Sequence, residues 1–363
     1  MSGSTRLSSE PVRLRPWHLL RVPAPPAKTE VLTSHRPRTT RRRTVAAADP
    51  LSGAGHEVAV WEYAPQLRDE PSPEDDIAVE PATLVFVHGF RGDHHGLALL
   101  ADCLPEHRIL SVDLPGFGAS PAYPHAEHTV DHHAQTLGQV RQALELDERT
   151  GLVAHSYGTI VAAALCASRP QAWSFLALLN PIAEPALSAS STWLDRASAL
   201  LAQGYYEAAA RLPARLSDAL LRSSLITWAT TVFMSRTDDA RVLAYTHDQH
   251  RRHFSGFASP AQVAQSYRAS TTGSVPDSAA GLSLPVLLLA GDEDPLGSPA
   301  AQRALAADVA AASPRCRLVL LPGVGHLLHY ERPRECASLI RDFLSRARPR
   351  PGANARARRS GRA

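Results

Sequence analysis

The sequence has few aromatic residues, almost no lysine and no long apolar run. Aromatic residues make up 6% of the 363 positions, although 44% are hydrophobic and can form a sizeable core. A transmembrane helix needs about 20 consecutive apolar residues, and no stretch approaches that length. The N-terminus also lacks the apolar core of a secretory signal, because Trp17 to Val22 is short and prolines follow it. We therefore expect no transmembrane segment and a cytoplasmic protein.

Cysteine is scarce as well, and the spacing of the cysteines argues against a disulfide-rich domain and against a zinc-binding domain. The four cysteines (Cys103, Cys166, Cys316 and Cys336) are scattered without a CxxC pair. This spacing predicts neither a disulfide framework nor a zinc site, and it favours a reducing compartment.

The middle of the chain has a deficit of positive charge, with 21 basic against 32 acidic side chains, whereas both ends are basic. Residues 1–50 hold ten basic and three acidic side chains, and residues 345–363 hold seven arginines and no acid. Lys28 is the single lysine, a bias typical of GC-rich coding DNA, so the basic ends do not indicate a nucleic-acid partner. Organelle transit peptides are also arginine-rich, but the prolines and the missing amphipathic helix favour the cytoplasm.

Strand-like and helix-like segments alternate along most of the chain. The apolar runs at 83–87, 108–113, 151–154, 174–180, 285–290 and 317–321 predict buried parallel strands, and 56–63 alternates like a strand at the sheet edge. Between 182 and 284 strand-like runs disappear, and amphipathic stretches predict helices at about 191–202, 205–222, 225–234, 238–250 and 260–270, with a break near residue 203. We expect an α/β fold with a mostly parallel sheet, helices on both faces and an inserted helical cap. The domains are a disordered extension (1–52), a core (53–181 and 285–346), the cap (182–284) and a disordered tail (347–363).

One short stretch joins a buried strand to a helix through a serine. Residues 152–154 are apolar, His155-Ser156-Tyr157-Gly158 follow, and a small-residue helix begins at Thr159. A serine at such a junction lies on a strained turn, with its hydroxyl clear of the sheet at the positive end of the helix. The small residues at 154 and 158 let strand and helix close around that turn. Ser156 is therefore the candidate nucleophile.

An acid and a histidine follow later strands. Asp294 comes after the strand at 285–290 and His326 after the strand at 317–321. Ligands of open α/β sheets gather beyond the carboxyl ends of the strands, so these side chains are expected near Ser156. Asp292 competes with Asp294 as the acid, and His329 competes with His326 as the base. We favour Asp294 and His326.

The order serine, acid, histidine resembles that of the α/β-hydrolase superfamily, over about residues 56–345. The shared motifs are His88-Gly89-Phe90, Asp113 to Ser120, His155 to Gly158, Gly291 to Asp294 and Gly325-His326. Ala154 replaces the first glycine of the usual elbow, as in some lipases. The resemblance implies Ser156 as nucleophile, His326 as base and Asp294 as its partner. It also implies backbone N–H groups of Phe90 and Tyr157 as the oxyanion hole.

These residues predict a serine hydrolase that cleaves a carboxylic ester of a small, apolar substrate through an acyl-enzyme, without a cofactor. A thioesterase, a lactonase and a C–C bond hydrolase use the same residues and stay open. Phe90-Arg91-Gly92-Asp93 replaces the Gly-Pro-Gly stretch usual in C–C bond hydrolases. A non-catalytic binding protein of the same fold is the alternative outside enzymes. The sequence does not indicate an oligomeric state.

Histidines are numerous, and two of them lie one helical turn apart. His128 and His132 have the spacing of metal ligands on one helix face, but no acidic or cysteine partner stands at a diagnostic distance. We therefore assign no metal. His94 and His95 follow the segment at 88–90 and are expected to border the acyl pocket. Asp113 is expected to bond the backbone of its own turn.

Overall fold

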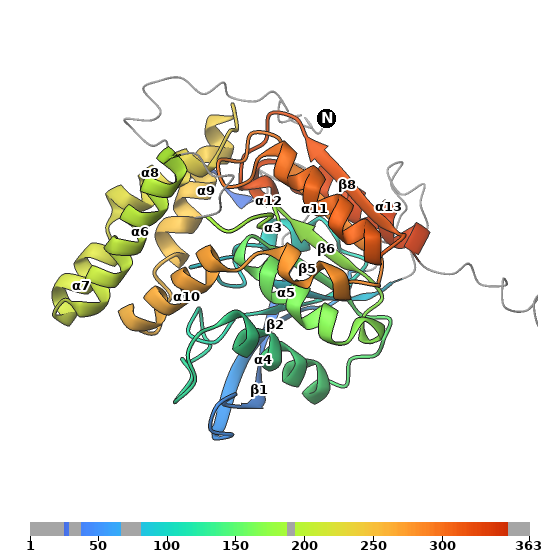
Figure 1. Ribbon diagram of the computed structural model, residues 1–363, viewed down its shortest axis with the longest axis horizontal. Helices are drawn as coiled ribbons and strands as arrows, with labels where there is room; N and C mark the ends of the chain where they lie inside the picture. Colours follow the sequence, from blue (N-terminus) through green and yellow to red (C-terminus); the bar gives the residue numbers. More distant parts are fainter. Residues whose placement is uncertain (1–24, 29–37, 67–80, 187–192, 348–363) are drawn as a thin grey trace, which may run out of the picture.

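The computed structural model describes residues 25–28, 38–66, 81–186 and 193–347, which surround one eight-stranded sheet (Figure 1). Its strands are β1 (Thr40–Ala48), β2 (Gly55–Tyr63), β3 (Thr83–Val87), β4 (Arg108–Val112), β5 (Gly151–His155), β6 (Leu176–Leu179), β7 (Val286–Gly291) and β8 (Cys316–Leu321). The order across the sheet is β1-β2-β4-β3-β5-β6-β7-β8. β2 pairs antiparallel with β1 and β4, and all other pairs are parallel. The expected α/β fold is confirmed.

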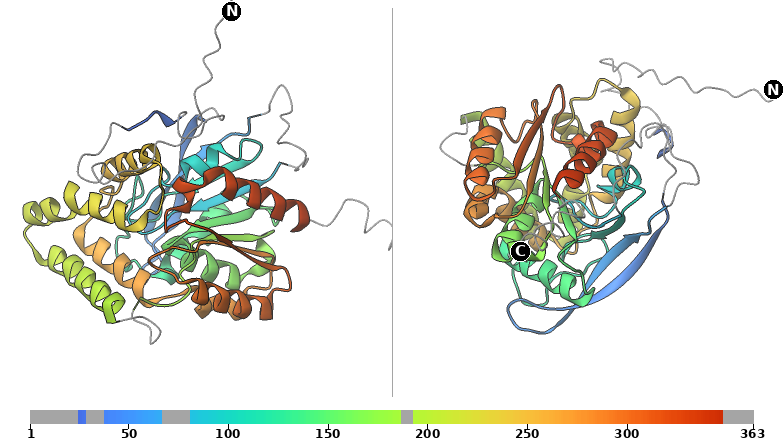
Figure 2. Two further views of the ribbon diagram at one scale, coloured as in Figure 1. Left: turned by 90° about the horizontal axis from the view of Figure 1, so that it is seen from above. Right: turned by 90° about the vertical axis from the view of Figure 1, so that its right-hand side faces the viewer.

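Helices cover both faces of the sheet because the central strands are apolar on both sides (Figure 2). Along β3, Val85 and Val87 belong to one core, and Leu84 and Phe86 to the other. The first core packs against α4 (Val130–Ala143), α5 (Tyr157–Ser168) and α11 (Pro299–Ala312). The second packs against α3 (Ala98–Asp102), α12 (Leu328–Glu331) and α13 (Pro333–Ala347).

Between β6 and β7, the described residues form five α-helices, which gather on one side of the molecule (Figure 1). They are α6 (Trp193–Arg211), α7 (Ala214–Leu221), α8 (Ser224–Met234), α9 (Ala240–His253) and α10 (Pro260–Thr272). The sequence predicted a break near residue 203, but α6 runs on to Arg211 and the chain turns at Pro213, which lacks an N–H. We keep 182–284 as the proposed cap. In the described parts of the chain, no helix is long and apolar enough to cross a membrane.

The expected disorder of residues 1–52 is wrong for their last part. Thr40–Ala48 form β1, which pairs with β2 along its whole length, so β1 and not β2 forms the sheet edge. The turn between them is held by Asp49, whose Oδ1 accepts the backbone N–H groups of Leu51 and Ser52. β1 is rich in arginine because most of it is exposed, and this composition hid the strand. Residues 1–24, 29–37 and 348–363 lie outside the described residues.

Arg38 fastens the start of this strand to the core. Its guanidinium donates to five backbone carbonyls, those of Tyr63, Ala64, Ala101, Leu104 and His107. Its own backbone N–H donates to Asp102 Oδ1 at 2.9 Å, and Lys28 pairs with the other oxygen of that carboxylate. A single buried side chain thereby satisfies carbonyls at the ends of two strands and a helix.

We expect Arg38→Met to lower the free energy of unfolding by about 2–4 kcal/mol, because several buried carbonyls lose their donor. Urea denaturation followed by circular dichroism measures the loss. Arg41→Met is the matched control, since Arg41 is exposed and makes a surface ion pair with Glu62 at 3.4 Å. Such pairs contribute about 1 kcal/mol or less. Equal losses in the two variants would contradict an anchoring role for Arg38.

Candidate active site

Ser156 lies on a strained turn between β5 and α5. Its φ is 52° and its ψ is −123°, a backbone conformation that non-glycine residues rarely adopt. The turn forms with alanine at position 154, which is fully buried. Gly158 is required by close packing, since a Cβ there would lie 2.5 Å from the carbonyl oxygen of His88. Strand and helix are therefore close enough to hold the serine hydroxyl at the rim of the sheet.

The structure brings His326 and Asp294 together with this serine. His326 Nε2 lies 2.8 Å from Ser156 Oγ, and His326 Nδ1 lies 2.9 Å from Asp294 Oδ2. The three residues follow β5, β7 and β8, whose carboxyl ends meet at one edge of the sheet. All three residues are largely buried, so the two hydrogen bonds are mostly surrounded by protein.

The competing residues have other partners. Asp292 Oδ1 accepts the backbone N–H of Gly323 at 2.7 Å and thereby braces the turn before His326. His329 is buried with its ring centroid 4.1 Å from that of His155. Burial lowers the pKa of His329 well below its usual value, so this ring is neutral.

Asn180, which the sequence analysis missed, joins the two loops that carry the acid and the histidine. Its side-chain oxygen accepts the N–H of Gly291, and its side-chain nitrogen donates to the carbonyl of Gly325. Asn180 follows β6 and is fully buried with a positive φ of 44°. A polar residue directly after an apolar strand is the signal that could have identified it.

Glu331 supports the loop that carries His326. Its carboxylate accepts the backbone N–H groups of Gly325 and Arg236, and the N–H of His326 donates to the carbonyl of Met234 at 2.9 Å. Burial raises the pKa of Glu331 to about 7, and the two backbone N–H groups only partly offset this shift. The loop that positions His326 thus depends on a carboxyl group that titrates near neutral pH.

The segments that carry the two candidate oxyanion donors both lie next to Ser156. Tyr157 is the first residue of α5, so its N–H has no acceptor within the helix. Gly89 precedes Phe90 and passes so close that a Cβ on it would lie 3.1 Å from Ser156 Cβ. The Tyr157 side chain is buried and bonds His133 Nδ1 at 2.8 Å, so its ring is held on the core side.

His88 and His155 are buried beside the serine and bond backbone groups. His88 Nε2 accepts the N–H of Leu114, which leaves the proton on Nδ1, 2.8 Å from the carbonyl of Gly89. His155 Nε2 lies 3.0 Å from the carbonyl of His326 and donates to it. Burial lowers the pKa of both rings, so they are neutral supports of the loops around the serine.

Arg91 connects the loop after β3 to the cap. It has a positive φ of 60°, and its side chain is buried. Its guanidinium donates to the carbonyls of Leu221, at the end of α7, and Phe254, at the end of α9. The position of Phe90 next to it is therefore coupled to the position of the cap.

A cavity of about 900 Å³ opens between cap and core next to Ser156. Its lining includes several aromatic and apolar side chains, among them Phe90, Tyr206, Phe233, Met234, Phe254 and Tyr267. Glu184, Gln249 and His253 add polar groups. A cavity of this size and lining suits a drug-sized, mainly apolar ligand.

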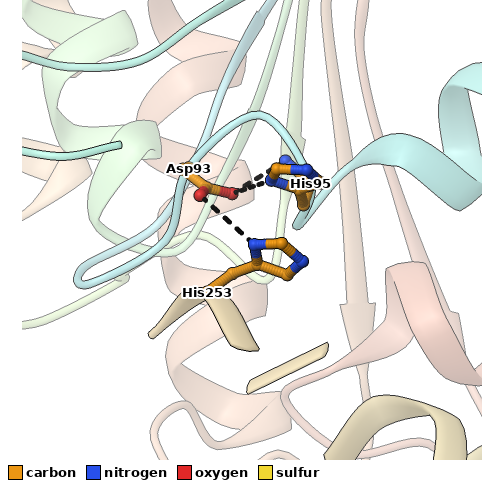
Figure 3. A group of neighbouring side chains, drawn as sticks. All are labelled: Asp93, His95 and His253. Carbon is orange, nitrogen blue, oxygen red and sulfur yellow. Dashed lines mark hydrogen bonds and ion pairs between the residues drawn. The ribbon is translucent and has the colours of Figure 1, made fainter. Parts of the chain in front are cut away.

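Asp93 and His253 line this cavity, but His94 and His95, which were expected to border the acyl pocket, do not. His95 instead forms a cluster with Asp93 and His253 (Figure 3). Asp93, His95 and His253 place one ligand atom each within 4.8 Å of one another. The His128 and His132 pair lies elsewhere: His128 Nδ1 bonds Gln265 and His132 Nδ1 bonds the carbonyl of Glu127. Asp113 accepts the N–H groups of His94 and Ala119. Asp113 therefore bonds the backbone of its own turn, as expected, and also the backbone of the loop after β3.

A family model, two curated relatives and a solved structure agree on the kind of protein that this chain resembles. A family model described as "alpha/beta hydrolase fold" matches residues 82–333. A probable lysophospholipase, BODYGUARD 4 of Arabidopsis thaliana, is 30% identical over 122 residues, which are 32% of this chain and 28% of that protein. Lipase 3 of Moraxella sp. is 31% identical over 97 residues, 27% of this chain and 30% of the lipase. The match thus covers less than a third of the length of each of these two relatives.

Among solved structures, a thermophilic esterase from Thermogutta terrifontis superposes with a TM-score of 0.64 at 19% identity. The superposition covers 85% of this chain and 100% of the esterase. At 19% identity, this similarity shows a shared fold only.

We expect Glu331→Gln to change how stability depends on pH. Because the pKa of Glu331 is about 7 in the folded protein and 4.5 is its usual value, the folded protein holds a proton that the unfolded chain has lost between these pH values. The free energy of unfolding of the native protein therefore falls as the pH rises through this window, by about 3 kcal/mol. In Glu331→Gln this part of the pH dependence disappears.

Urea denaturation at pH 5, 6, 7 and 8 measures the free energy of unfolding of the native protein and of Glu331→Gln. Only the native protein should lose the stability calculated above as the pH rises. Glu335→Gln, at an exposed position of α13, is the control and should keep the native slope. Parallel pH profiles for the native protein and Glu331→Gln would contradict the prediction.

Proposed function

We propose that this chain, which belongs to the α/β-hydrolase fold family, is a serine hydrolase that cleaves carboxylic esters. The observation that carries the proposal is the position of His326, whose two ring nitrogens lie 2.8 Å from Ser156 Oγ and 2.9 Å from Asp294 Oδ2. Such a chain of hydrogen bonds is what an activated serine nucleophile needs.

In the proposed mechanism, His326 Nε2 takes the proton of Ser156 as Oγ attacks the ester carbonyl. Asp294 accepts the Nδ1–H of His326, keeps the ring in this tautomer and stabilises its protonated form. The backbone N–H groups of Phe90 and Tyr157 stabilise the oxyanion of the tetrahedral intermediate. His326 then protonates the leaving alcohol, and water hydrolyses the acyl-enzyme by the same steps. This chemistry uses no cofactor.

The relatives and the cavity support an ester of a small, mainly apolar acyl group. A lipase and a probable lysophospholipase are among the relatives, and an esterase is among the structural neighbours. Thioesters and lactones suit the same groups and belong in a substrate panel. The absence of Gly-Pro-Gly after His88-Gly89 places C–C bond hydrolysis second. The cytoplasmic location stays a prediction.

We expect Ser156→Ala to lower the hydrolysis of short p-nitrophenyl esters by at least about 10³-fold, because no comparable nucleophile replaces the hydroxyl. Ser168→Ala is the matched control, since Ser168 is an exposed residue at the other end of α5. A fluorophosphonate probe should label the native protein, and mass spectrometry should find the adduct on Ser156. Unchanged hydrolysis in Ser156→Ala, or an adduct on another serine, would refute the assignment.

The aromatic wall of the cavity should control the length of the acyl chain. Tyr206 and Tyr267 have ring centroids 4.5 Å apart, and those of Phe90 and Tyr206 are 5.4 Å apart. Truncating Tyr206 removes an apolar contact of about 1–3 kcal/mol that only a long chain makes. We expect Tyr206→Ala to raise KM for p-nitrophenyl octanoate about tenfold or more and to leave the acetate ester nearly unchanged.

Steady-state kinetics with both esters tests this expectation. Tyr205→Ala is the control, because the hydroxyl of Tyr205 bonds the carbonyl of Leu220 within the cap. An equal rise in KM for both esters in Tyr206→Ala would contradict a chain-length role.

A further inference from the structure

Three side chains of types that can bind a metal ion lie together where the loop after β3 packs against the end of α9 (Figure 3). Asp93 and His95 come from the loop, and His253 is the last residue of α9. The two oxygens of Asp93 lie 3.0 Å from His95 Nδ1 and 3.8 Å from His253 Nδ1. One carboxylate thus faces a histidine of the core and a histidine of the cap.

We propose that Asp93, His95 and His253 bind a divalent first-row transition-metal ion such as Zn²⁺, which joins the cap to the loop that carries Phe90. None of the three residues belongs to the proposed catalytic triad, so the proposal does not depend on the catalytic role of Ser156.

The donor set suits this class of ion, and its three ligand atoms lie within 4.8 Å of one another. Two imidazoles and a carboxylate are common ligands of Zn²⁺, which binds them at about 2.0–2.2 Å in a tetrahedral arrangement. Ligand atoms around such an ion are therefore roughly 3.3 Å apart, and the two distances to Asp93 lie on either side of this value. Ca²⁺ and Mg²⁺ prefer shells made of oxygen and do not suit a site with two nitrogens.

Metal binding requires one imidazole ring to turn. The rings of His95 and His253 are stacked, with centroids 3.6 Å apart and planes 16° from parallel. A metal ion lies in the plane of each imidazole that binds it, so two stacked rings do not share one ion. The side chain of His253 is 26% exposed and that of His95 39% exposed, which leaves both rings room to rotate.

The surroundings favour a cation and orient the loop. Asp113 is fully buried behind the cluster and bonds both the backbone N–H and Nδ1 of His94. The His94 ring lies 3.8 Å from the His95 ring, so this carboxylate indirectly supports a ligand. The nearest arginine in sequence to His253, Arg252, is paired with Asp248 at 2.7 Å. Negative charge therefore faces the site from the core side.

The ion would strengthen a connection that Arg91 already makes. Arg91 and Asp93 stand two positions apart in the loop, and they contact Phe254 and His253, which are adjacent at the end of α9. Binding of a metal to the loop and the helix together would restrict movement of the cap relative to Phe90.

The test uses the tag-free, full-length protein after treatment with a chelator. We expect isothermal titration with Zn²⁺ to show one site per chain, and Co²⁺ to give a visible absorption band in the native protein. His253→Ala and His95→Ala should each weaken Zn²⁺ binding at least about tenfold and abolish the Co²⁺ band. Hydrogen exchange at the end of α9 should slow when Zn²⁺ is added.

His125→Ala is the matched control, since it removes an exposed histidine elsewhere and should bind as the native protein does. Circular dichroism shows whether each variant is folded, and His253→Gln replaces any His253→Ala that is not. Two results would overturn the proposal: a native protein that gives no Co²⁺ band, or folded His95 and His253 variants that bind Zn²⁺ as tightly as the native protein.

Discussion

The contact between His326 Nε2 and Ser156 Oγ joins residues 170 positions apart, and most of the site serves to hold its two ends. The serine end is set by the strained turn after β5, which needs glycine at position 158. The histidine end is held by Asn180, by the carbonyl of Met234 and by Glu331. A hydrogen bond tolerates errors of only a few tenths of an ångström, so both ends must be rigid.

The loop after β3 links this chemistry to the cap. It carries Phe90, a proposed oxyanion donor, and Arg91, which donates to backbone carbonyls at the ends of α7 and α9. Asp93 in the same loop faces His253 of the cap. A movement of the proposed cap would therefore reach the backbone that borders the serine through these few consecutive residues.

The sequence predicted the central elements well because they are buried on both faces. The run at 83–87 is a continuous apolar strand, and β5 covers the expected 151–154. Prediction failed where the surroundings decide the structure. Thr40–Ala48 contains three consecutive arginines and became a strand because β2 offered an unpaired edge. The helix break expected near residue 203 lies instead at Pro213, since α6 packs along α10.

The sequence by itself determined the family, the order of serine, acid and histidine, and their places after strands, because strand and elbow patterns are local. Tertiary structure decided which atoms meet. Several supporting side chains bond groups that are distant in sequence or that belong to no local motif. They are Asn180, Arg91 and Glu331. The grouping of Asp93 and His95 with His253 joins residues about 160 positions apart across the cap interface. Such contacts depend on how the cap packs onto the sheet, and no periodicity in the chain encodes that packing.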